Sequence, residues 1–262
     1  MDAYEKYMTN FDAVAAKNAV VRWIRTKINN FSPYYKAVIG ISGGKDSTVV
    51  AALCAEAIGP DRVYGVMMPN GNQADIKDAE EVIKLLKIHN HLINIENLTN
   101  EFARLVELTL DKPSEQAMIN MPPRIRMTAL YAVAQTLGRA FVINTCNLSE
   151  DFIGYSTWHG DSAGDFSPLA NFTSDEVMAI GDACGLPHYL THKTPSDGLC
   201  GKSDEDNLGF TYKALNQFIR LGIIESKETL IKINSRHVAN LFKLEPLDYF
   251  RFDPIIFQKS RT

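Results

Sequence analysis

A glycine-rich turn between two apolar segments constrains the fold of this chain more than any other feature. Residues 37–39 are apolar, residues 40–47 read G-I-S-G-G-K-D-S, and residues 48–53 have a helical composition. This order predicts a strand, a tight turn and a helix. Paired glycines let backbone N–H groups approach an anion closely, because no Cβ intervenes. The start of the helix adds unpaired N–H groups and the positive end of a dipole. The turn is therefore predicted to bind phosphate.

Asp46 is an unusual member of such a turn, since a carboxylate repels phosphate unless a cation lies between them. It therefore indicates Mg²⁺, while Ser42, Ser47 and Lys45 can add hydroxyl and ammonium donors. The turn matches neither G-x-x-x-x-G-K-[ST] nor G-x-G-x-x-G. It resembles the pyrophosphate loop of the N-type ATP pyrophosphatases, which cleave ATP between its α and β phosphates. The alternative is an ordinary strand-to-helix turn, with Asp and Ser as helix caps.

The whole chain has the composition of a globular protein. It has 262 residues, of which 45% are hydrophobic and 22% are charged, so one large domain or two small ones can bury a sizeable core. The formal net charge of −4 argues against a general nucleic-acid surface. The four cysteines form no C-x-x-C and have no histidine at zinc-ligand spacing. With no signal peptide and no apolar run of membrane-spanning length, we expect a cytoplasmic protein without nucleic-acid or membrane partners.

Apolar segments that alternate with amphipathic ones predict an α/β fold. Strands are expected at residues 37–41, 62–68, 92–95 and 140–144, with a weaker fifth at 189–192. Helices are expected at residues 3–29, 74–89, 98–110, 124–137 and 174–183. This alternation predicts a doubly wound, Rossmann-like parallel sheet in three layers. We expect a single domain over residues 1–262, with an N-terminal helix at 1–29, a nucleotide-binding core at 35–200 and C-terminal helices and a tail at 201–262.

Polar residues follow the predicted strands at the edge where ligands bind in such sheets. After residues 140–144 comes T-C-N-L-S-E, whose Glu150 is predicted to be a second Mg²⁺ ligand opposite Asp46. A simple helix-start carboxylate, favoured by the dipole, is the alternative. A glycine-spaced loop follows at residues 154–165 and ends in Asp165. Arg124 comes after M-P-P, which we expect to fix the start of a helix. Because a first-turn arginine opposes the helix dipole, it indicates an anionic or aromatic partner.

Taken together, these motifs resemble the ammonia-dependent NAD synthetases. The resemblance covers most of residues 35–220 and rests on S-G-G-K-D-S, P-N-G-N-Q-A-D, P-R-I-R-M-T-A-L-Y, N-T-C-N-L-S-E, G-Y-S-T-W-H-G-D-S-A-G-D-F-S-P-L and K-T-P-S-D-G-L. It implies that ATP activates the nicotinate carboxylate of deamido-NAD as an adenylate with release of pyrophosphate. Ammonia then replaces AMP to give NAD. It also implies a homodimer. Since the chain is too short for the amidohydrolase domain of glutamine-using versions, we expect ammonia as the nitrogen donor.

The resemblance also implies roles for particular residues. Asp46 and Glu150 match the Mg²⁺ ligands. Lys193 and Asp165 match groups close to the chemistry, where Lys193 stabilises charge on the phosphates and Asp165 lies near the nicotinate ring and the incoming amine. The residues that match deamido-NAD contacts are Arg124, Trp158, Asp165 and Lys243. The residues that match ATP contacts are Gly40, Ile41, Ser42, Gly43, Gly44, Lys45, Asp46, Ser47, Thr145, Lys193 and Ser196.

The sequence departs from this pattern at three places. Many relatives have lysine where this chain has Trp158 and Ser174, and the C-terminal H-K-R pattern reads Phe242-Lys243-Leu244 here. Fewer cations are therefore available to two phosphate-bearing ligands, and we expect Trp158 to stack on a pyridine or adenine ring instead.

Two other classes of function compete with this interpretation. One is another N-type ATP pyrophosphatase, such as a tRNA sulfur-transfer enzyme or GMP synthetase. The former needs paired or catalytic cysteines and a basic surface, which this sequence lacks. The other is a non-catalytic ATP-binding sensor. A sensor could keep the glycine turn, but it would not need Glu150, Lys193 and Asp165 as well.

Overall fold

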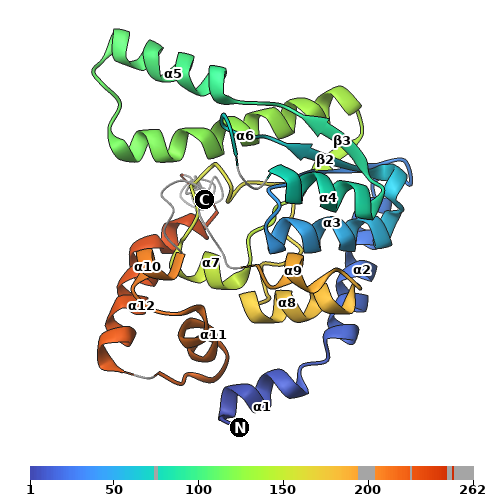
Figure 1. The fold of residues 1–262 in the computed structure, drawn as a ribbon, viewed down its shortest axis with the longest axis vertical. Coiled ribbons are helices and arrows are strands. Elements are labelled where there is room, and N and C mark those ends of the chain that lie inside the picture. The colour runs from blue at the N-terminus through green and yellow to red at the C-terminus, as the bar shows by residue number, and fades with distance from the viewer. Residues whose placement is uncertain (74–75, 194–203, 225, 247–249, 251–262) are drawn as a thin grey trace, which may run out of the picture.

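The fold is built around a four-stranded parallel sheet. The computed structural model describes residues 1–73, 76–193, 204–224, 226–246 and 250 (Figure 1). The strands are β1 (Lys36–Gly40), β2 (Val63–Met67), β3 (His89–Leu92) and β4 (Ala140–Val142), in the order β3-β2-β1-β4. Every pair is parallel, and Val38 of β1 lies opposite both Tyr64 of β2 and Val142 of β4. The predicted parallel sheet is thus confirmed.

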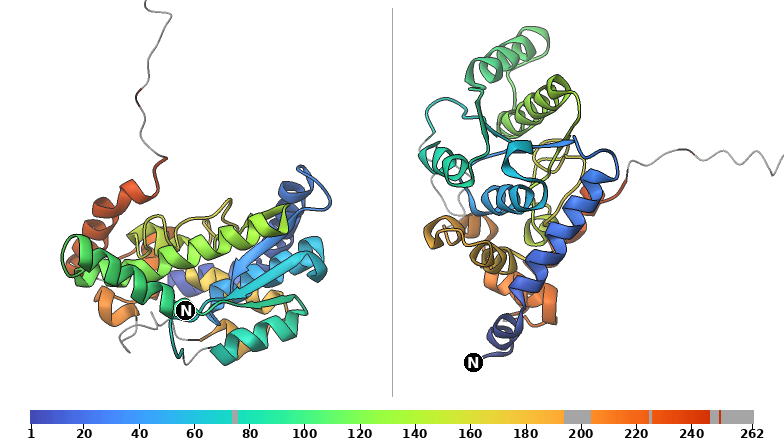
Figure 2. Two further views of the ribbon diagram at one scale, coloured as in Figure 1. Left: turned by 90° about the horizontal axis from the view of Figure 1, so that it is seen from above. Right: turned by 90° about the vertical axis from the view of Figure 1, so that its right-hand side faces the viewer.

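Helices cover both faces of this sheet. Strand side chains alternate between faces, so Ala37 and Ile39 enter one core while Val38 enters the other. The first core is completed by α2 (Ala13–Asn29), α3 (Lys45–Ile58), α4 (Ile76–Leu86) and α8 (Ser174–Ala183). The second is completed by α5 (Glu96–Thr109) and α6 (Glu115–Leu137). In the right-hand view of Figure 2, α5 and α6 lie on one side of the sheet and α3 on the other. The three-layer, Rossmann-like architecture is confirmed.

A third, smaller core joins the C-terminal part of the chain to the helix after β4. Its helices are α7 (Leu148–Ile153), α10 (Asp204–Leu208), α11 (Tyr212–Leu221) and α12 (Lys227–Asn240), which continues into a 3₁₀ turn, η2 (Leu241–Lys243). Ile153, Leu215 and Ile233 are fully buried between them. This packing brings η2 against the loop that follows α7, where Lys243 Nζ donates hydrogen bonds to the carbonyl oxygens of Gly154 and Ser156.

Two predicted helices differ in the structure, one by a break and one by its start. Residues 3–29 form two helices, α1 (Ala3–Asn10) and α2, because Phe11 is extended and the Asp12 side chain caps α2 by accepting from Ala15 N–H. The helix predicted to start at Arg124 starts at Glu115 and contains Pro122 and Pro123 in its interior. Arg124 is therefore not on a first turn, and the dipole argument for its partner was wrong.

Two predicted strands also differ. The third strand is formed by residues 89–92 rather than 92–95. Residues 189–192 do not form a strand, since His188–Thr191 form the short helix α9 after Pro187. A four-residue segment with a single aliphatic side chain fits either state, and here burial of Leu190 against α3 selects the helix. In the part of the chain described by the structure, no helix has the length and apolar character needed to cross a membrane.

Gly154 should be essential to the junction of the third core. It ends α7 with φ of 64°, and a Cβ there would lie 2.1 Å from the Cβ of Asn240 on α12. We expect Gly154→Ala to lower the free energy of unfolding by about 3 kcal/mol, through backbone strain and a displaced α12. Gly222 is the matched control, because it is also left-handed, with φ of 68°, and a Cβ there would meet nothing within 4 Å. Gly222→Ala should cost about 1 kcal/mol in urea unfolding, and equal losses would contradict the packing argument.

Candidate active site

The glycine turn joins the end of β1 to the start of α3 and is held by its two serines. Gly43 has φ of 84°, which favours glycine, and Gly44 caps the helix. Ser42 Oγ accepts from Gly44 N–H at 3.1 Å and lies 3.1 Å from Ser47 Oγ. Ser47 Oγ in turn donates to the Gly44 carbonyl oxygen. The predicted strand, turn and helix are confirmed, and the N–H groups at the start of α3 face the carboxyl end of the sheet.

Lys45 and Asp46 form an ion pair at this turn. Lys45 Nζ lies 2.8 Å from Asp46 Oδ2, and the lysine side chain is buried while that of Asp46 is partly exposed. Burial makes the lysine charge a fixed part of the turn, because an ammonium ion is costly to bury without a partner. The sequence alone did not predict this pairing.

Asn147 links the two carboxylates predicted to bind metal. Its Nδ2 donates to Asp46 Oδ1 at 3.0 Å, and its backbone N–H donates to Glu150 Oε2 at 3.2 Å. Its Oδ1 accepts from the backbone N–H of Glu150, so that Asn147 and Glu150 form the capping box of α7. Asn147 is fully buried. Its role was not predicted from the sequence, although the N-x-x-E spacing is a capping-box signal.

The environment of this pair strongly disfavours two uncompensated negative charges. Burial, and then the nearby charge of Asp46, raise the pKa of Glu150 to about 8, against an opposing effect of Lys45. A divalent cation would remove this cost, and hard carboxylate oxygens are the donors that Mg²⁺ prefers. Among the described residues, no cluster of three or more acidic, histidine or cysteine side chains forms a metal site. Two carboxylates fit an ion that takes its remaining ligands from phosphate oxygens and water.

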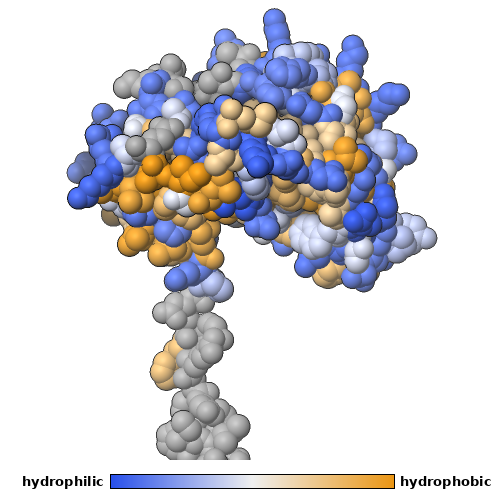
Figure 3. Space-filling model, turned by 90° about the horizontal axis from the view of Figure 1, so that it is seen from below, coloured by the Kyte–Doolittle hydropathy of each residue, from blue (hydrophilic) through white to orange (hydrophobic). Residues whose placement is uncertain are grey.

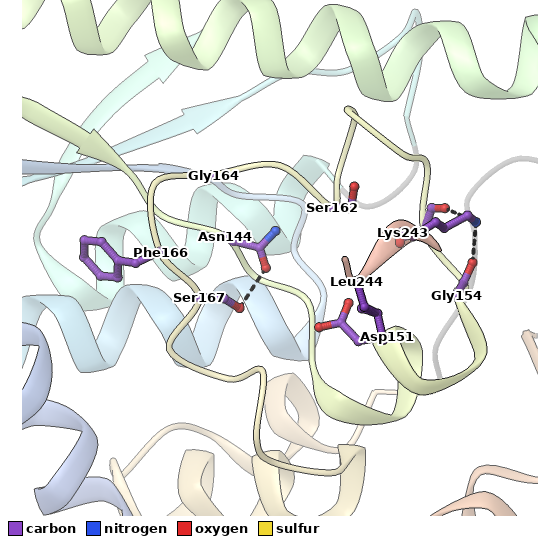
Figure 4. A pocket seen from close by; sticks show the side chains of 10 residues that line it. Asn144, Asp151, Gly154, Ser162, Gly164, Phe166, Ser167, Lys243 and Leu244 are labelled. Carbon is purple, nitrogen blue, oxygen red and sulfur yellow. Dashed lines mark hydrogen bonds between the residues drawn. The ribbon is translucent and has the colours of Figure 1, made fainter. Parts of the chain in front are cut away.

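Asn144 holds the glycine-spaced loop over the end of β4. Its Nδ2 donates to the carbonyl oxygens of Asp161 and Ala163, both at 2.9 Å. Its Oδ1 accepts from Cys146 N–H and from the Ser167 hydroxyl, as Figure 4 shows for Ser167. Thr145, which is partly buried, lies between Asn144 and Cys146. Asn144 is a second buried amide that the sequence analysis missed, and the polar residue inside the apolar run 140–144 was its signal.

Asp165 is held at the edge of β4 by its carboxylate. Oδ2 accepts from Val142 N–H at 2.7 Å, and Oδ1 lies 3.4 Å from the hydroxyl oxygen of Tyr131 on α6. Burial, followed by the charge of Asp165, raises the pKa of Tyr131. The phenol therefore stays protonated and can donate to the carboxylate.

A polar cavity of about 220 Å³ lies between this loop and η2. Figure 4 shows Asn144, Ser162 and Ser167 on the loop side, with Asp151 and Lys243 opposite them. Burial, with a smaller effect of the Asp161 charge, raises the pKa of Asp151 to about 6. The cavity is thus lined by groups of both signs next to the loop that carries Asp165.

The structure brings a second group of predicted residues together at the rim of this loop. Arg124, exposed on α6, donates from Nε to the Trp158 carbonyl oxygen at 3.3 Å. The Trp158 ring packs against Phe242, the residue before Lys243, with centroids 5.1 Å apart. Lys193 lies elsewhere, where its Nζ is 2.6 Å from Asp78 Oδ2 on α4. Ser196 lies outside the described residues.

Known proteins resemble this chain in sequence and in fold. Residues 16–244 match the sequence profile of the NAD synthase family. The chain belongs to the NAD synthase family. Two NH(3)-dependent NAD(+) synthetases are among its relatives within that family. The one from Pyrococcus horikoshii is 40% identical over 201 residues, which cover 76% of this chain and 75% of that protein. The one from Mycoplasmopsis pulmonis is 33% identical over 240 residues, with 89% and 91% covered.

Solved structures of this family have the same fold. An NMN synthetase from Francisella tularensis matches with a TM-score of 0.85 and 31% identity, over 93% of this chain and 100% of that chain. An NH3-dependent NAD synthetase from Campylobacter jejuni, in complex with the nitrate ion, matches with a TM-score of 0.74 and 25% identity. That match covers 92% of this chain and 100% of the other.

Glu150 should reduce the stability of the metal-free protein as the pH rises. Below its ordinary pKa of 4.5 the carboxyl is protonated in both states and costs nothing. Between pH 4.5 and about 8 the unfolded chain releases the proton while the folded protein retains it, so stability falls with pH. Allowing for partial exposure, Glu150→Gln should raise the free energy of unfolding by about 2 kcal/mol at pH 8 and by less than about 1 kcal/mol at pH 5. Urea titrations in the presence of EDTA, at pH 5 and at pH 8, measure the two changes in the free energy of unfolding. The control is Glu228→Gln, at an exposed position, which should show no gain at either pH. A gain that does not depend on pH would contradict the assignment.

Proposed function

We propose that this chain catalyses the ATP-dependent amidation of deamido-NAD with ammonia. The nicotinate carboxylate attacks the α-phosphorus of ATP, the bond to the pyrophosphate oxygen breaks, and an adenylate forms. Ammonia then attacks the activated carbonyl carbon, the bond to AMP breaks, and the nitrogen releases a proton to give the amide. The observation that best supports this reaction is the pair of carboxylates, Asp46 and Glu150, which Asn147 joins beside a phosphate-binding turn.

The ATP side is assigned to the glycine turn and the end of β4. Residues 40–47, Thr145, Lys193 and Ser196 are proposed to contact ATP, with Asp46 and Glu150 holding Mg²⁺. When bound, Mg²⁺ neutralises charge on the phosphates and the departing pyrophosphate. Lys193, now paired with Asp78, is proposed to exchange this carboxylate for a phosphate oxygen. Such positioning and charge stabilisation supply most of the catalysis in phosphoryl and adenylyl transfer.

The binding site for the nucleotide that accepts the amine is assigned to the rim of the loop at residues 154–165 and to Asp165 at the end of that loop. Arg124, Trp158 and Lys243 are proposed to contact the nicotinate nucleotide. The Asp165 carboxylate, fixed by Val142 N–H, is proposed to orient the incoming amine, because an anion attracts ammonium and accepts its hydrogen bonds.

Purified protein with ATP, Mg²⁺, deamido-NAD and ammonium should form NAD, AMP and pyrophosphate. Asp46→Asn and Glu150→Gln should each lower kcat by at least about 10³-fold, because the metal ligand is lost. Asn147→Ala should lower kcat by about 10–100-fold, since it orients both carboxylates without contacting substrate. Asp61→Asn, at an exposed position in the turn before β2, serves as the control. An ATP-binding sensor would release no pyrophosphate on addition of deamido-NAD.

A second acceptor, nicotinate mononucleotide, is favoured by two observations. The first is the likeness to the NMN synthetase, at a TM-score of 0.85. The second is that the rim beside Arg124 carries the uncharged rings of Trp158 and Phe242. Amidation of nicotinate mononucleotide yields NMN by the same two steps.

We further propose a cytoplasmic homodimer in which each chain forms a single domain. On α5 the residues Leu98, Phe102, Leu105 and Leu108 form an exposed apolar stripe at helical spacing. On the neighbouring α6, Met118 and Ile119 extend it. Apolar faces of this kind are typical of interfaces between subunits. The same helix α6 carries Arg124, so the interface would lie near the acceptor side.

The stripe predicts the effect of a charge on assembly. Leu105→Glu should convert the homodimer to a monomer in sedimentation velocity, because it would bury an unpaired carboxylate in an apolar interface. Leu85→Glu is the matched control, since Leu85 has the same exposure, 45%, on the separate helix α4. A dimer that survives Leu105→Glu, or a wild-type monomer, would contradict the assignment.

A further inference from the structure

A buried polar triad joins the helix that carries Glu150 to two other helices. It consists of Ser149 on α7, Ser174 on α8 and Asn216 on α11, which are at most 2% exposed. We propose that Ser149 and Asn216 are positioning residues, which hold α7 in the orientation that a shared metal site requires of Glu150. This inference rests on the proposed ATP and metal site, and extends it to side chains that are too deeply buried to contact a substrate.

The helix α7 depends on outside contacts for its orientation, because its six residues are too few to form a stable helix alone. Its first turn is capped by Asn147, and Gly154 ends it in a left-handed conformation. These caps fix where the helix begins and ends, whereas its rotation about its own axis is set by the face that packs. Ser149 and Ile153, four residues apart, share that face and are both fully buried.

The hydrogen bonds of the triad form a closed ring. Ser149 Oγ donates to Asn216 Oδ1 at 2.6 Å and accepts from the backbone N–H of Ser174 at 2.9 Å. Asn216 Nδ2 then donates to Ser174 Oγ at 3.0 Å. All three residues lie beneath the surface that Figure 3 shows from the side of α1 and α11. Because water does not compete at such depth, a satisfied network holds its members in one arrangement.

The partner helices form a rigid frame for this ring. One turn after Asn216, Arg220 binds the Glu176 carboxylate through two hydrogen bonds, from Nε at 2.8 Å and from Nη2 at 2.6 Å. The buried Glu176 carboxylate also accepts from the Tyr7 hydroxyl on α1. A bidentate arginine–carboxylate pair restricts the relative rotation of the two helices that carry it. Ser149 is therefore anchored to α8 and α11, which are themselves tied together.

The ring bears on the metal site because Ser149 directly precedes Glu150. Successive residues of a helix point about 100° apart, so the rotation that directs Ser149 to Asn216 also sets the direction of Glu150. Asn147 ties the start of the same helix to Asp46 at 3.0 Å. The first turn of α7 is thus held by two buried amides, one next to Asp46 and one in the core. Loss of outer contacts of this kind typically lowers metal affinity by about 10–100-fold.

The test separates positioning from simple packing by measuring how much Mg²⁺ strengthens nucleotide binding. Calorimetric titration with α,β-methylene ATP, whose α–β bridge resists cleavage, gives one Kd with Mg²⁺ and one with EDTA. Their ratio reports the part of the affinity that the metal supplies, and wild type should bind more tightly with Mg²⁺. Ser149→Ala and Asn216→Ala should each reduce this ratio about tenfold, and should leave the Kd in EDTA within about twofold of wild type.

The combined variants give a second readout. Because both changes break the same hydrogen bond, Ser149→Ala and Asn216→Ala together should reduce the ratio no more than about twofold beyond either change alone. Ser174→Ala should shift it by less than about threefold, since both hydrogen bonds of Ser149 remain. Ser149→Ala removes a single oxygen atom, and it decides the question if Asn216→Ala does not fold.

Thr99→Val is the matched control, because Thr99 on α5 is equally buried and its hydroxyl donates to the Ile95 carbonyl oxygen at 2.9 Å. It should lower the midpoint of urea unfolding, as the triad variants do, without changing the ratio. An unchanged ratio in Ser149→Ala would overturn the inference, as would an equal fall in Thr99→Val or a wild type whose affinity does not depend on Mg²⁺. A protein that shows the expected ratios but forms no amide product would instead overturn the proposed function.

Discussion

The proximity of two carboxyl groups at the end of a parallel sheet is the constraint on which the site depends. Asp46 comes from the crossover after β1 and Glu150 from the helix after β4, and a single buried amide, Asn147, bonds to both. Burial, and then the charge of Asp46, raise the pKa of Glu150 to about 8. A fold retains such an arrangement at a cost in stability, and functional sites are where such costs are found. A divalent ion bound with a triphosphate would convert that cost into affinity.

The sheet topology explains why these groups meet. β1 and β4 are adjacent and parallel, so their carboxyl ends lie at one edge, and the chain leaves each strand through a turn that carries polar residues. Two buried asparagines organise that edge. Asn147 orients the two carboxylates that are proposed to hold the metal, and Asn144 holds the loop that carries Asp161 and Asp165. Buried amides with satisfied donors and acceptors can fix a loop as firmly as an element of secondary structure.

Local signals in the sequence predicted most of the elements that form the site. The glycine turn, β1, β2 and α8 lie where apolar periodicity and turn residues indicate, because these features depend on neighbouring residues. Predictions failed where tertiary packing prevailed over local rules. Pro122 and Pro123 suggested a helix start, yet α6 runs through them, and their rings pack in the interior and against Gly160. Residues 189–192 read Y-L-T-H, a segment with one aliphatic side chain that is too short for periodicity to distinguish strand from helix.

The sequence by itself indicated the chemistry proposed for the site: a turn suited to phosphate, an aspartate whose place in that turn favours a cation, and a second carboxylate after a later strand. Each depends on residue type and on spacing within a few positions, which a single sequence displays. The tertiary structure alone decided that Asn147 joins the two carboxylates, that Lys193 pairs with Asp78, and that Trp158 packs on Phe242. The contacts of Asn147 with Asp46, of Lys193 with Asp78 and of Trp158 with Phe242 join residues separated by many tens of positions. The packing of three hydrophobic cores creates them, and no local pattern records them.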